Sequence, residues 1–148
     1  MTDAVSTRTG SVPAVAKLLP VLVPTAIGTR ALFVLMCGAR PRKVMVEFFG
    51  SRFDGPSGTA FGLLFTGTDA VLGYGLARSR TAPGRVAGWL LAGAGIDFLH
   101  TVLAATNRDF SPTRRRATAA LIGGFVMTGI AMARAAAQQA AAQPATEK

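Results

Sequence analysis

Four apolar stretches, each long enough to cross a membrane, constrain this chain more than any other feature of its sequence. A hydrocarbon layer of about 30 Å takes roughly 17 to 25 helical residues, at about 1.5 Å of rise for each. Half of the chain is hydrophobic and 16% is charged, against roughly 25% charged in soluble domains. The sequence therefore predicts an all-α integral membrane four-helix bundle in one domain. The four stretches are residues 18–39, 59–77, 86–106 and 117–137.

The distribution of charge within these stretches separates a membrane protein from a soluble one. Helices of a soluble bundle carry apolar residues on one stripe and charged residues on the opposite face. Here each stretch holds at most one or two charged residues, and the rest of its circumference is Ala, Gly, Leu, Val, Phe or Ile. This pattern favours helices surrounded by lipid, and the mean hydropathy of +0.39 agrees with it.

The composition of the remaining segments predicts two tails and one extra helix. Residues 1–17 are rich in Ser, Thr and Gly, and residues 138–148 are low-complexity Ala and Gln. Both are typical of flexible tails around a domain of residues 18–137, and the alternative for the second is an extension of the last helix up to Pro144. The first connection, "PRKVMVEFFGSRF", predicts a short amphipathic helix that lies in the membrane interface and covers the end of the bundle. Its apolar face holds Val44, Met45, Phe48 and Phe49.

The net charge of +9 comes from basic residues in the connections between the stretches. No surface aromatics alternate with them, which argues against nucleic-acid binding, and basic flanks on apolar helices favour anchoring to anionic lipid head groups. Seven Lys and Arg lie on the side of both termini and eight on the other, so the positive-inside rule gives no orientation. The arginines of the short connection "RSRTAPGR" favour a multi-pass cell-membrane protein with both termini in the cytoplasm.

Small residues form a stripe along three of the stretches. In lipid, close approach of helix backbones at Gly, Ala, Ser and Thr supplies attraction between helices, so these stripes are expected to face the bundle interior. Trp89 and Tyr74, near the ends of stretches, are expected to be interfacial anchors. The stripes are Gly62, Thr66, Asp69 and Gly73 in the second stretch, Gly93, Asp97, His100 and Ala104 in the third, and Ala117, Gly124, Thr128 and Ala131 in the fourth.

Three charged residues, Arg30, Asp69 and Asp97, lie near the middle of their stretches. At about 1.5 Å of rise per residue, all three fall within roughly 2 Å of one plane at the centre of the bilayer. A charge at that depth costs about 2.5 to 3.5 kcal/mol on insertion scales. Pairing offsets part of this cost, so we expect Arg30 within about 4 Å of Asp69 or Asp97.

His100, the only histidine, follows Asp97 by three residues and lies on the same helical face. With Arg30 and both aspartates ionised, the group has an excess negative charge, which protonation of one aspartate or of His100 would remove. The pattern predicts either a cluster that exchanges a proton or a network that only fixes the register of the helices. We refer to Arg30, Asp69, Asp97 and His100 as the polar cluster.

The motifs around these residues resemble those of a family of small four-helix integral membrane proteins of unknown function. The family pattern has Gly-x-Arg in the first helix, a proline step followed by an aromatic and Gly, Gly-x-Arg-Asp with a following Gly in the second helix, and Asp-x-x-Asp in the third. Arg30, Asp69 and Asp97 fall on pattern positions, whereas Thr68 replaces an Arg and His100 replaces the second Asp. The resemblance implies the fold and brings no known activity. The matching stretches are "IGTRALF", "ARPRKVMVEFFG", "GTDAVLG" and "WLLAGAGIDFLHTVLAAT".

The residue types present give little support to an enzyme or a cofactor site. One histidine per chain is too few for a bis-histidine haem or a di-metal site of His and carboxylates, and no phosphate-binding loop follows a strand. We therefore expect a structural or partner-binding membrane subunit without a metal or other cofactor, forming a homo-oligomer or binding another membrane protein. The first alternative is a proton-linked carrier or channel that uses the polar cluster as an oligomer. The second is a small membrane enzyme.

Overall fold

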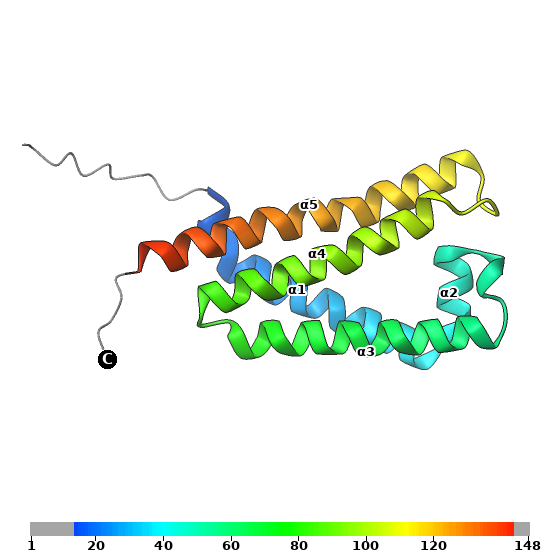
Figure 1. Ribbon diagram of the computed structural model, residues 1–148, viewed down its shortest axis with the longest axis horizontal. Helices are drawn as coiled ribbons and strands as arrows, with labels where there is room; N and C mark the ends of the chain where they lie inside the picture. The colour runs from blue at the N-terminus through cyan, green and yellow to red at the C-terminus, as the bar shows by residue number, and fades with distance from the viewer. Residues whose placement is uncertain (1–13, 144–148) are drawn as a thin grey trace, which may run out of the picture.

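Four long helices run side by side in residues 14–143, the part of the chain that the computed structural model describes (Figure 1). Each of them is long and apolar enough to cross a membrane. The predicted all-α four-helix architecture is therefore confirmed. The N-terminal end of the first long helix and the C-terminal end of the last one lie at the same end of the bundle (Figure 1). The helices are α1 (Ala14–Ala39), α3 (Pro56–Ser79), α4 (Pro83–Ala105) and α5 (Pro112–Ala142).

Proline sets the start of every described α-helix after α1, whereas the short 3-10 helix η1 (Ser51–Phe53) has none. A proline occupies the first turn of α2 (Pro41–Phe49), α3, α4 and α5. Its φ already suits a helix, and it has no N–H that the first turn would leave unpaired. Ser111 completes the start of α5, since its side chain accepts a hydrogen bond from the Arg114 N–H at 3.3 Å. These helices consequently begin a few residues before the apolar stretches from which they were predicted.

α1 and α5 extend into segments that were predicted to be tails. α1 begins at Ala14, and α5 continues through the Ala- and Gln-rich segment to Ala142. Alanine has the highest helix propensity and glutamine is also favourable, so this segment prolongs the helix. Gln139 also donates a hydrogen bond to the Ala16 carbonyl at 3.0 Å, which joins the end of α5 to the start of α1. The other predicted tail residues, 1–13 and 144–148, lie outside the described residues.

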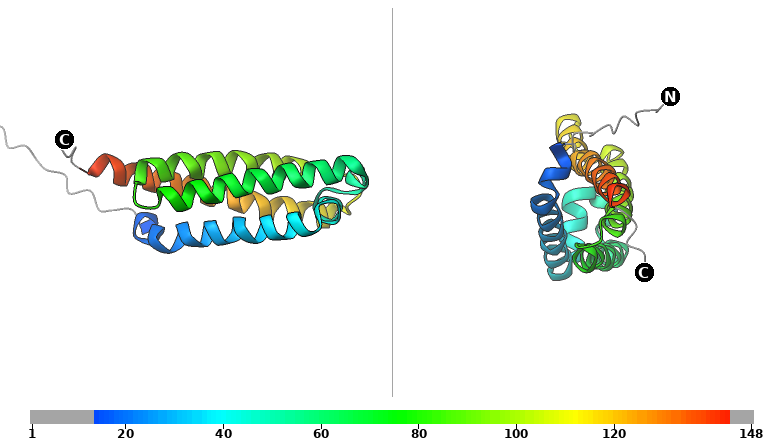
Figure 2. Two further views of the ribbon diagram at one scale, coloured as in Figure 1. Left: turned by 90° about the horizontal axis from the view of Figure 1, so that it is seen from below. Right: turned by 90° about the vertical axis from the view of Figure 1, so that its left-hand side faces the viewer.

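The helices pack most closely as two pairs, α4 with α5 and α1 with α3, which Figure 2 shows from the side and from the end. On α5, Ile122 and Ala133 are buried, and a Cβ on Gly129 would lie 3.3 Å from the Cβ of Ala94 on α4. The residues of the stripe predicted for α5 are exposed instead, and of them only Thr128 lines the cavity described below. Small residues occur on both faces of this helix, so their spacing alone does not select the packed face. The exposed stripe is Ala117, Gly124, Thr128 and Ala131.

Buried apolar side chains gather in two clusters among the described residues, one toward each end of the bundle. The first lies where α1 begins and α5 ends, and the second lies next to α2. The middle of the bundle, between these clusters, contains the charged residues described below. The largest members of the first cluster are Leu19, Leu76, Leu90 and Met132, and the second comprises Met45, Phe49, Phe53, Phe65, Ala104 and Ile122.

α2 crosses the end of the bundle between α1 and α3 (Figure 1). Val44, Met45 and Phe49 are buried and Phe48 is half-buried, so the apolar face predicted for this helix packs onto the bundle. The predicted short helix and its apolar face are confirmed. α2 thereby covers one end of the space that the long helices enclose.

Hydrogen bonds join the end of α2 to the connection between α4 and α5. Gly50 has a φ of 95°, which favours glycine, and a Cβ there would lie 2.5 Å from Oδ1 of Asn107. The Ser51 N–H donates to the Asp109 carboxylate, and the Asp109 N–H donates to Asn107 Oδ1 at 3.0 Å. Hydrogen bonding from Ser51, through its side chain and its backbone, lowers the pKa of Asp109 below its ordinary value. We call these four residues the Gly50 junction.

Candidate functional site

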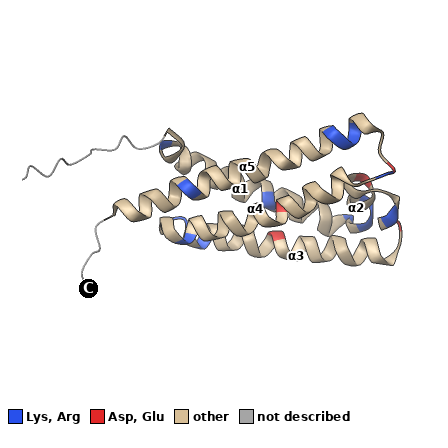
Figure 3. Ribbon diagram, turned by 45° about the horizontal axis from the view of Figure 1, so that its top comes forward, with Lys and Arg blue, Asp and Glu red and all other residues tan. Residues whose placement is uncertain are grey.

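Arg30 of α1 pairs with aspartates from two other helices. Its Nη1 donates to Asp69 of α3, and its Nη2 donates to Asp97 of α4 with 2.9 Å between Nη2 and Oδ2. The side chain of Asp69 is 3% exposed, that of Arg30 13% and that of Asp97 18%. Figure 3 shows this group of opposite charges midway along the bundle, apart from the charged ends. The structure thus brings together three residues of the polar cluster at one depth.

Gly93 makes room for the guanidinium of Arg30. A Cβ at Gly93 would lie 2.6 Å from Arg30 Nη2, closer than non-bonded atoms approach. A Cβ at Gly73, on α3, would lie 3.7 Å from the Cβ of Arg30, which is ordinary contact. Gly93 therefore lies against the charged end of Arg30, and Gly73 lies beside the base of its side chain.

The other small residues singled out in the sequence lie farther from the charges. A Cβ on Gly62 would lie 2.8 Å from the Pro41 carbonyl oxygen, so glycine lets α3 pass the start of α2. Thr66 is half-buried, and its methyl group would lie 3.7 Å from a Cβ on Gly38 of α1. Gly124 has no described atom within 4 Å of the place where its Cβ would be. The structure therefore brings Gly62 and Thr66 to helix contacts and leaves Gly124 outside them.

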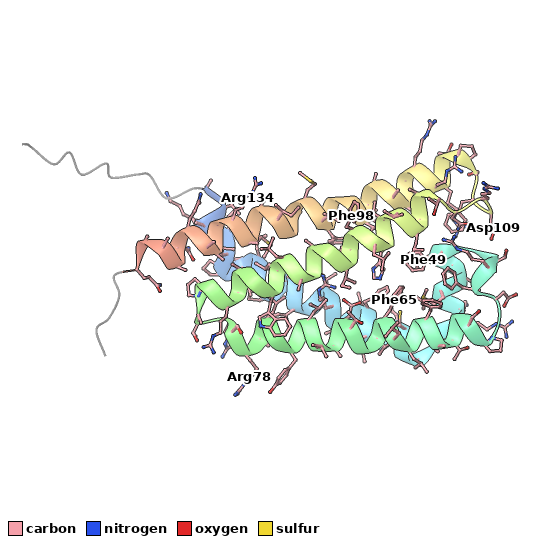
Figure 4. The ribbon with its side chains drawn as sticks, viewed as in Figure 1. Phe49, Phe65, Arg78, Phe98, Asp109 and Arg134 are labelled. Carbon is pink, nitrogen blue, oxygen red and sulfur yellow. The ribbon has the colours of Figure 1, made fainter. Side chains whose placement is uncertain are left out.

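His100 lies among aromatic rings beside the ion pairs. Its ring centroid is 4.4 Å from that of Phe65, 5.5 Å from that of Phe49 and 6.2 Å from that of Phe33. Figure 4 labels Phe49 and Phe65 near the α2 end. His100 is 5% exposed, and its Nε2 has no hydrogen-bond partner within residues 14–143. The structure thus places His100 in an aromatic enclosure and not in a hydrogen bond with Asp97.

A cavity of about 360 Å³ lies between α1 and the α4–α5 pair and reaches the polar cluster. All four residues of the cluster line it, and most of the remaining lining is apolar. Three threonines, two on α1 and one on α5, complete the polar part of the lining. They are Thr25, Thr29 and Thr128.

Exposed apolar side chains mark the mouth of this cavity. Leu32 of α1 is 58% exposed, and Leu121 and Phe125 of α5 are 61% and 45% exposed. All three also line the cavity, which therefore opens on the side of the bundle between α1 and α5. We call this space the α1–α5 cavity.

Sequence reasoning missed the aromatic part of this site. Trp89, expected to be an interfacial anchor, is half-buried in the cavity wall, and a Cβ on Gly75 would lie 2.3 Å from its ring. Trp89, Gly93 and Asp97 recur every four residues, so helical spacing already placed the tryptophan on the inward face of α4. Proximity to a helix end was the weaker signal.

The chain matches no family model, no curated protein and no solved structure. The likeness of its motifs to a four-helix membrane family therefore stays a resemblance between short stretches. The arrangement of the polar cluster and the α1–α5 cavity is the feature of the molecule that points to a function.

Proposed function

We propose that this chain is a small integral membrane protein that binds a small ligand in the α1–α5 cavity. The observation that carries the proposal is the position of the ion pairs in the cavity wall. An ion pair that only joins helices gains from close packing around it, because a void deprives its lining of dispersion contacts. A ligand in the cavity would restore those contacts beside Arg30 and Asp97.

The size of the cavity, about 360 Å³, suits a small molecule. Ligand pockets typically measure about 300 to 1,000 Å³, with apolar walls and a few polar groups. The lining of this cavity has the same composition, with apolar walls and the polar cluster.

The membrane would give this ligand its route to the site. With the four long helices spanning a bilayer, the mouth bordered by Leu32, Leu121 and Phe125 would face acyl chains. The basic connections at both ends would contact anionic head groups. In this arrangement the protein is a multi-pass protein of the cell membrane, and the arginine-rich connection between α3 and α4 favours both termini in the cytoplasm.

The alternative is a structural or partner-binding membrane subunit in which the polar cluster only fixes helix register. The two ion pairs of Arg30 favour it, because they hold α1 to α3 and α4 at one depth. A proton-linked carrier extends the ligand-binding role, since a proton could balance the excess negative charge whenever the ligand leaves. Such a carrier would act as an oligomer, because four helices are few to line a path.

Native mass spectrometry of the protein released from its own membrane tests the proposal. Thr128 lines the cavity, whereas the neighbouring Met127 is 69% exposed and lies outside the lining. Thr128→Phe therefore narrows the cavity, and Met127→Phe is its matched control. We expect the wild type and Met127→Phe to carry a small-molecule mass that Thr128→Phe lacks. Identical spectra for all three proteins would contradict ligand binding and favour the structural role.

A further inference from the structure

We infer that the ligand of the α1–α5 cavity is a lipophilic ammonium ion, a compact apolar molecule with one protonated amine. This inference rests on the proposed function, because it names the ligand class of the same cavity. Three features carry it: the charge of the polar cluster, the unpartnered nitrogen of His100 and the aromatic walls.

The charge of the site favours a cation. One guanidinium is shared between two carboxylates, so the ionised group of Arg30, Asp69 and Asp97 has an excess negative charge. Of the two aspartates, Asp97 is the more exposed, at 18% against 3%. Unbalanced charge is costly in apolar surroundings. A bound cation next to Asp97 reduces that cost, whereas an anion increases it.

His100 supplies a hydrogen-bond acceptor beside Asp97. It lies three residues farther along α4, on the same helical face, and both side chains line the cavity. His100 is 5% exposed, and Nε2 lacks a partner in the described part of the chain. A neutral imidazole has one acceptor nitrogen, and a primary ammonium has three N–H donors. Nε2 is closed off from water in the described structure, so the imidazole would have to turn toward the cavity for one ammonium to donate to both Nε2 and the Asp97 carboxylate.

The rest of the wall suits an apolar ligand body. Trp89, Phe33 and Phe125 line the cavity, and aromatic faces both bury apolar groups and attract cations within about 6 Å. A volume of about 360 Å³ lies near the lower end of the range of small-molecule pockets, about 300 to 1,000 Å³, so the occupant is a compact molecule.

A metal ion or a proton alone fits these features less well. Within residues 14–143, no group of three or more His, Cys, Asp and Glu side chains is arranged to hold a metal ion. A proton balances the charge but fills none of the volume, so the apolar walls remain without contacts. An ammonium ion with an apolar body satisfies the charge, the unpartnered nitrogen and the volume together.

Trp89 makes the inference testable, because it is the only tryptophan of the chain and lies in the cavity wall. The full chain in phosphatidylcholine vesicles is titrated with three probes that share one carbon cage: adamantylamine, adamantanol and adamantane carboxylate. Vesicles without protein correct for partitioning. We expect saturable changes in Trp89 fluorescence, with the amine bound about 10- to 100-fold more tightly than the alcohol and the carboxylate bound most weakly.

Two variants separate the contributions of charge and hydrogen bonding. Asp97→Asn keeps the shape and an acceptor for Arg30 but removes the excess charge, so the preference for the amine should disappear. Asp54→Asn is the matched control, because Asp54 pairs with Arg42 in an exposed position outside the cavity. His100→Phe keeps the aromatic enclosure without Nε2, and amine binding should weaken about 3- to 10-fold.

The outcomes distinguish the ligand class from the proposed function. Equal affinity for all three probes, lost in Thr128→Phe, would overturn the ammonium inference and support a cavity that binds ligands of another class. An amine preference that survives Asp97→Asn would overturn the role of the excess charge. Titrations that are flat, or identical in the wild type and Thr128→Phe, would overturn both the inference and the proposed function.

Discussion

The α2 end and the middle of the bundle surround their polar groups in opposite ways. At the α2 end, Asn107 is 2% exposed among tightly packed neighbours, and Gly50 leaves no room for a Cβ. In the middle, Arg30 and Asp97 border a cavity of about 360 Å³. Within residues 14–143, the α2 end has little space and no buried ion pair, whereas the middle of the bundle combines ion pairs with space.

This difference assigns different roles to the two regions. Close packing and local hydrogen bonds at the α2 end stabilise the fold and close the bundle. Charges beside a cavity cost stability, because they lose both water and packing contacts. Departures from close packing are expected mainly at functional sites, whereas a buried polar atom without a partner among the described residues occurs in both regions, at Asn107 Nδ2 and at His100 Nε2. The middle of the bundle is therefore the region where substitutions should separate stability from binding.

Removing the shared cation should have the largest effect. Arg30→Ala leaves Asp69 and Asp97 without their partner, and breaking a buried ion pair on one side costs about 3 to 5 kcal/mol. We expect a large fall in melting temperature in detergent. Replacing all three residues by Leu or Met should restore stability, because apolar side chains of similar volume replace buried ion pairs at little cost.

The same triple replacement separates the two roles of the cluster. Stability should return while adamantylamine binding, measured by Trp89 fluorescence, stays lost. Recovery of both would show that the cluster only joins helices. A melting temperature unchanged by Arg30→Ala would contradict any contribution of the ion pairs to stability.

The α2 end should respond more to volume than to charge. A Cβ on Gly62 would lie 2.8 Å from the Pro41 carbonyl oxygen, so Gly62→Ala should destabilise the bundle by about 1 to 3 kcal/mol. Gly67, five residues farther along α3, has no described atom within 4 Å of its Cβ position. Gly67→Ala should therefore be neutral or stabilise by up to about 1 kcal/mol, the helix-propensity gain. Equal melting temperatures for the two variants would contradict the close contact of α3 with α2.

The long helices and the charges at one depth could be predicted because both follow from the cost of exposing polar groups to lipid. Apolar length gives the spans, and a charge in the middle of a span needs a partner at the same depth. Arg30 with two aspartates illustrates this. The packed face of α5 could not be predicted, since Gly124 and Gly129 offer the same small surface on different sides of the helix.

The cavity could not be predicted either, because it depends on how far α1 lies from α5. No local pattern encodes that distance. The four-residue spacing between Trp89 and Gly93 predicts that Trp89 faces inward. Its position near a helix end predicts an interfacial anchor instead. Whether His100 forms a hydrogen bond also depends on tertiary packing. The rings of Phe49 and Phe65, which come from other helices, surround its imidazole.

His100 should show the sharpest separation of binding from stability. A buried polar atom without a partner costs about 1 to 3 kcal/mol, and Nε2 has none in the described part of the chain. His100→Phe should therefore keep or raise the melting temperature while amine binding falls. His100→Gln retains an acceptor and should keep part of the binding. A strongly destabilised His100→Phe variant would instead mean that the imidazole stabilises the bundle.

The smallest effect is expected at the Gly50 junction, outside the four long helices. Hydrogen bonding from Ser51 lowers the pKa of Asp109, so its ionised form is favoured in the folded state. A lowered folded-state pKa adds stability above the unfolded-state pKa, and that stability is lost as the pH falls through the folded-state pKa. Asp109 is exposed, so solvent weakens the effect.

Melting temperatures at pH 7 and at about pH 3 should converge slightly for Asp109→Asn relative to the wild type. Asp54→Asn, at the exposed pair with Arg42, is the control for general loss of a surface carboxylate. A pH dependence unchanged by Asp109→Asn but flattened by Asp54→Asn would place the acid-sensitive contact at the start of α3 and not at the junction.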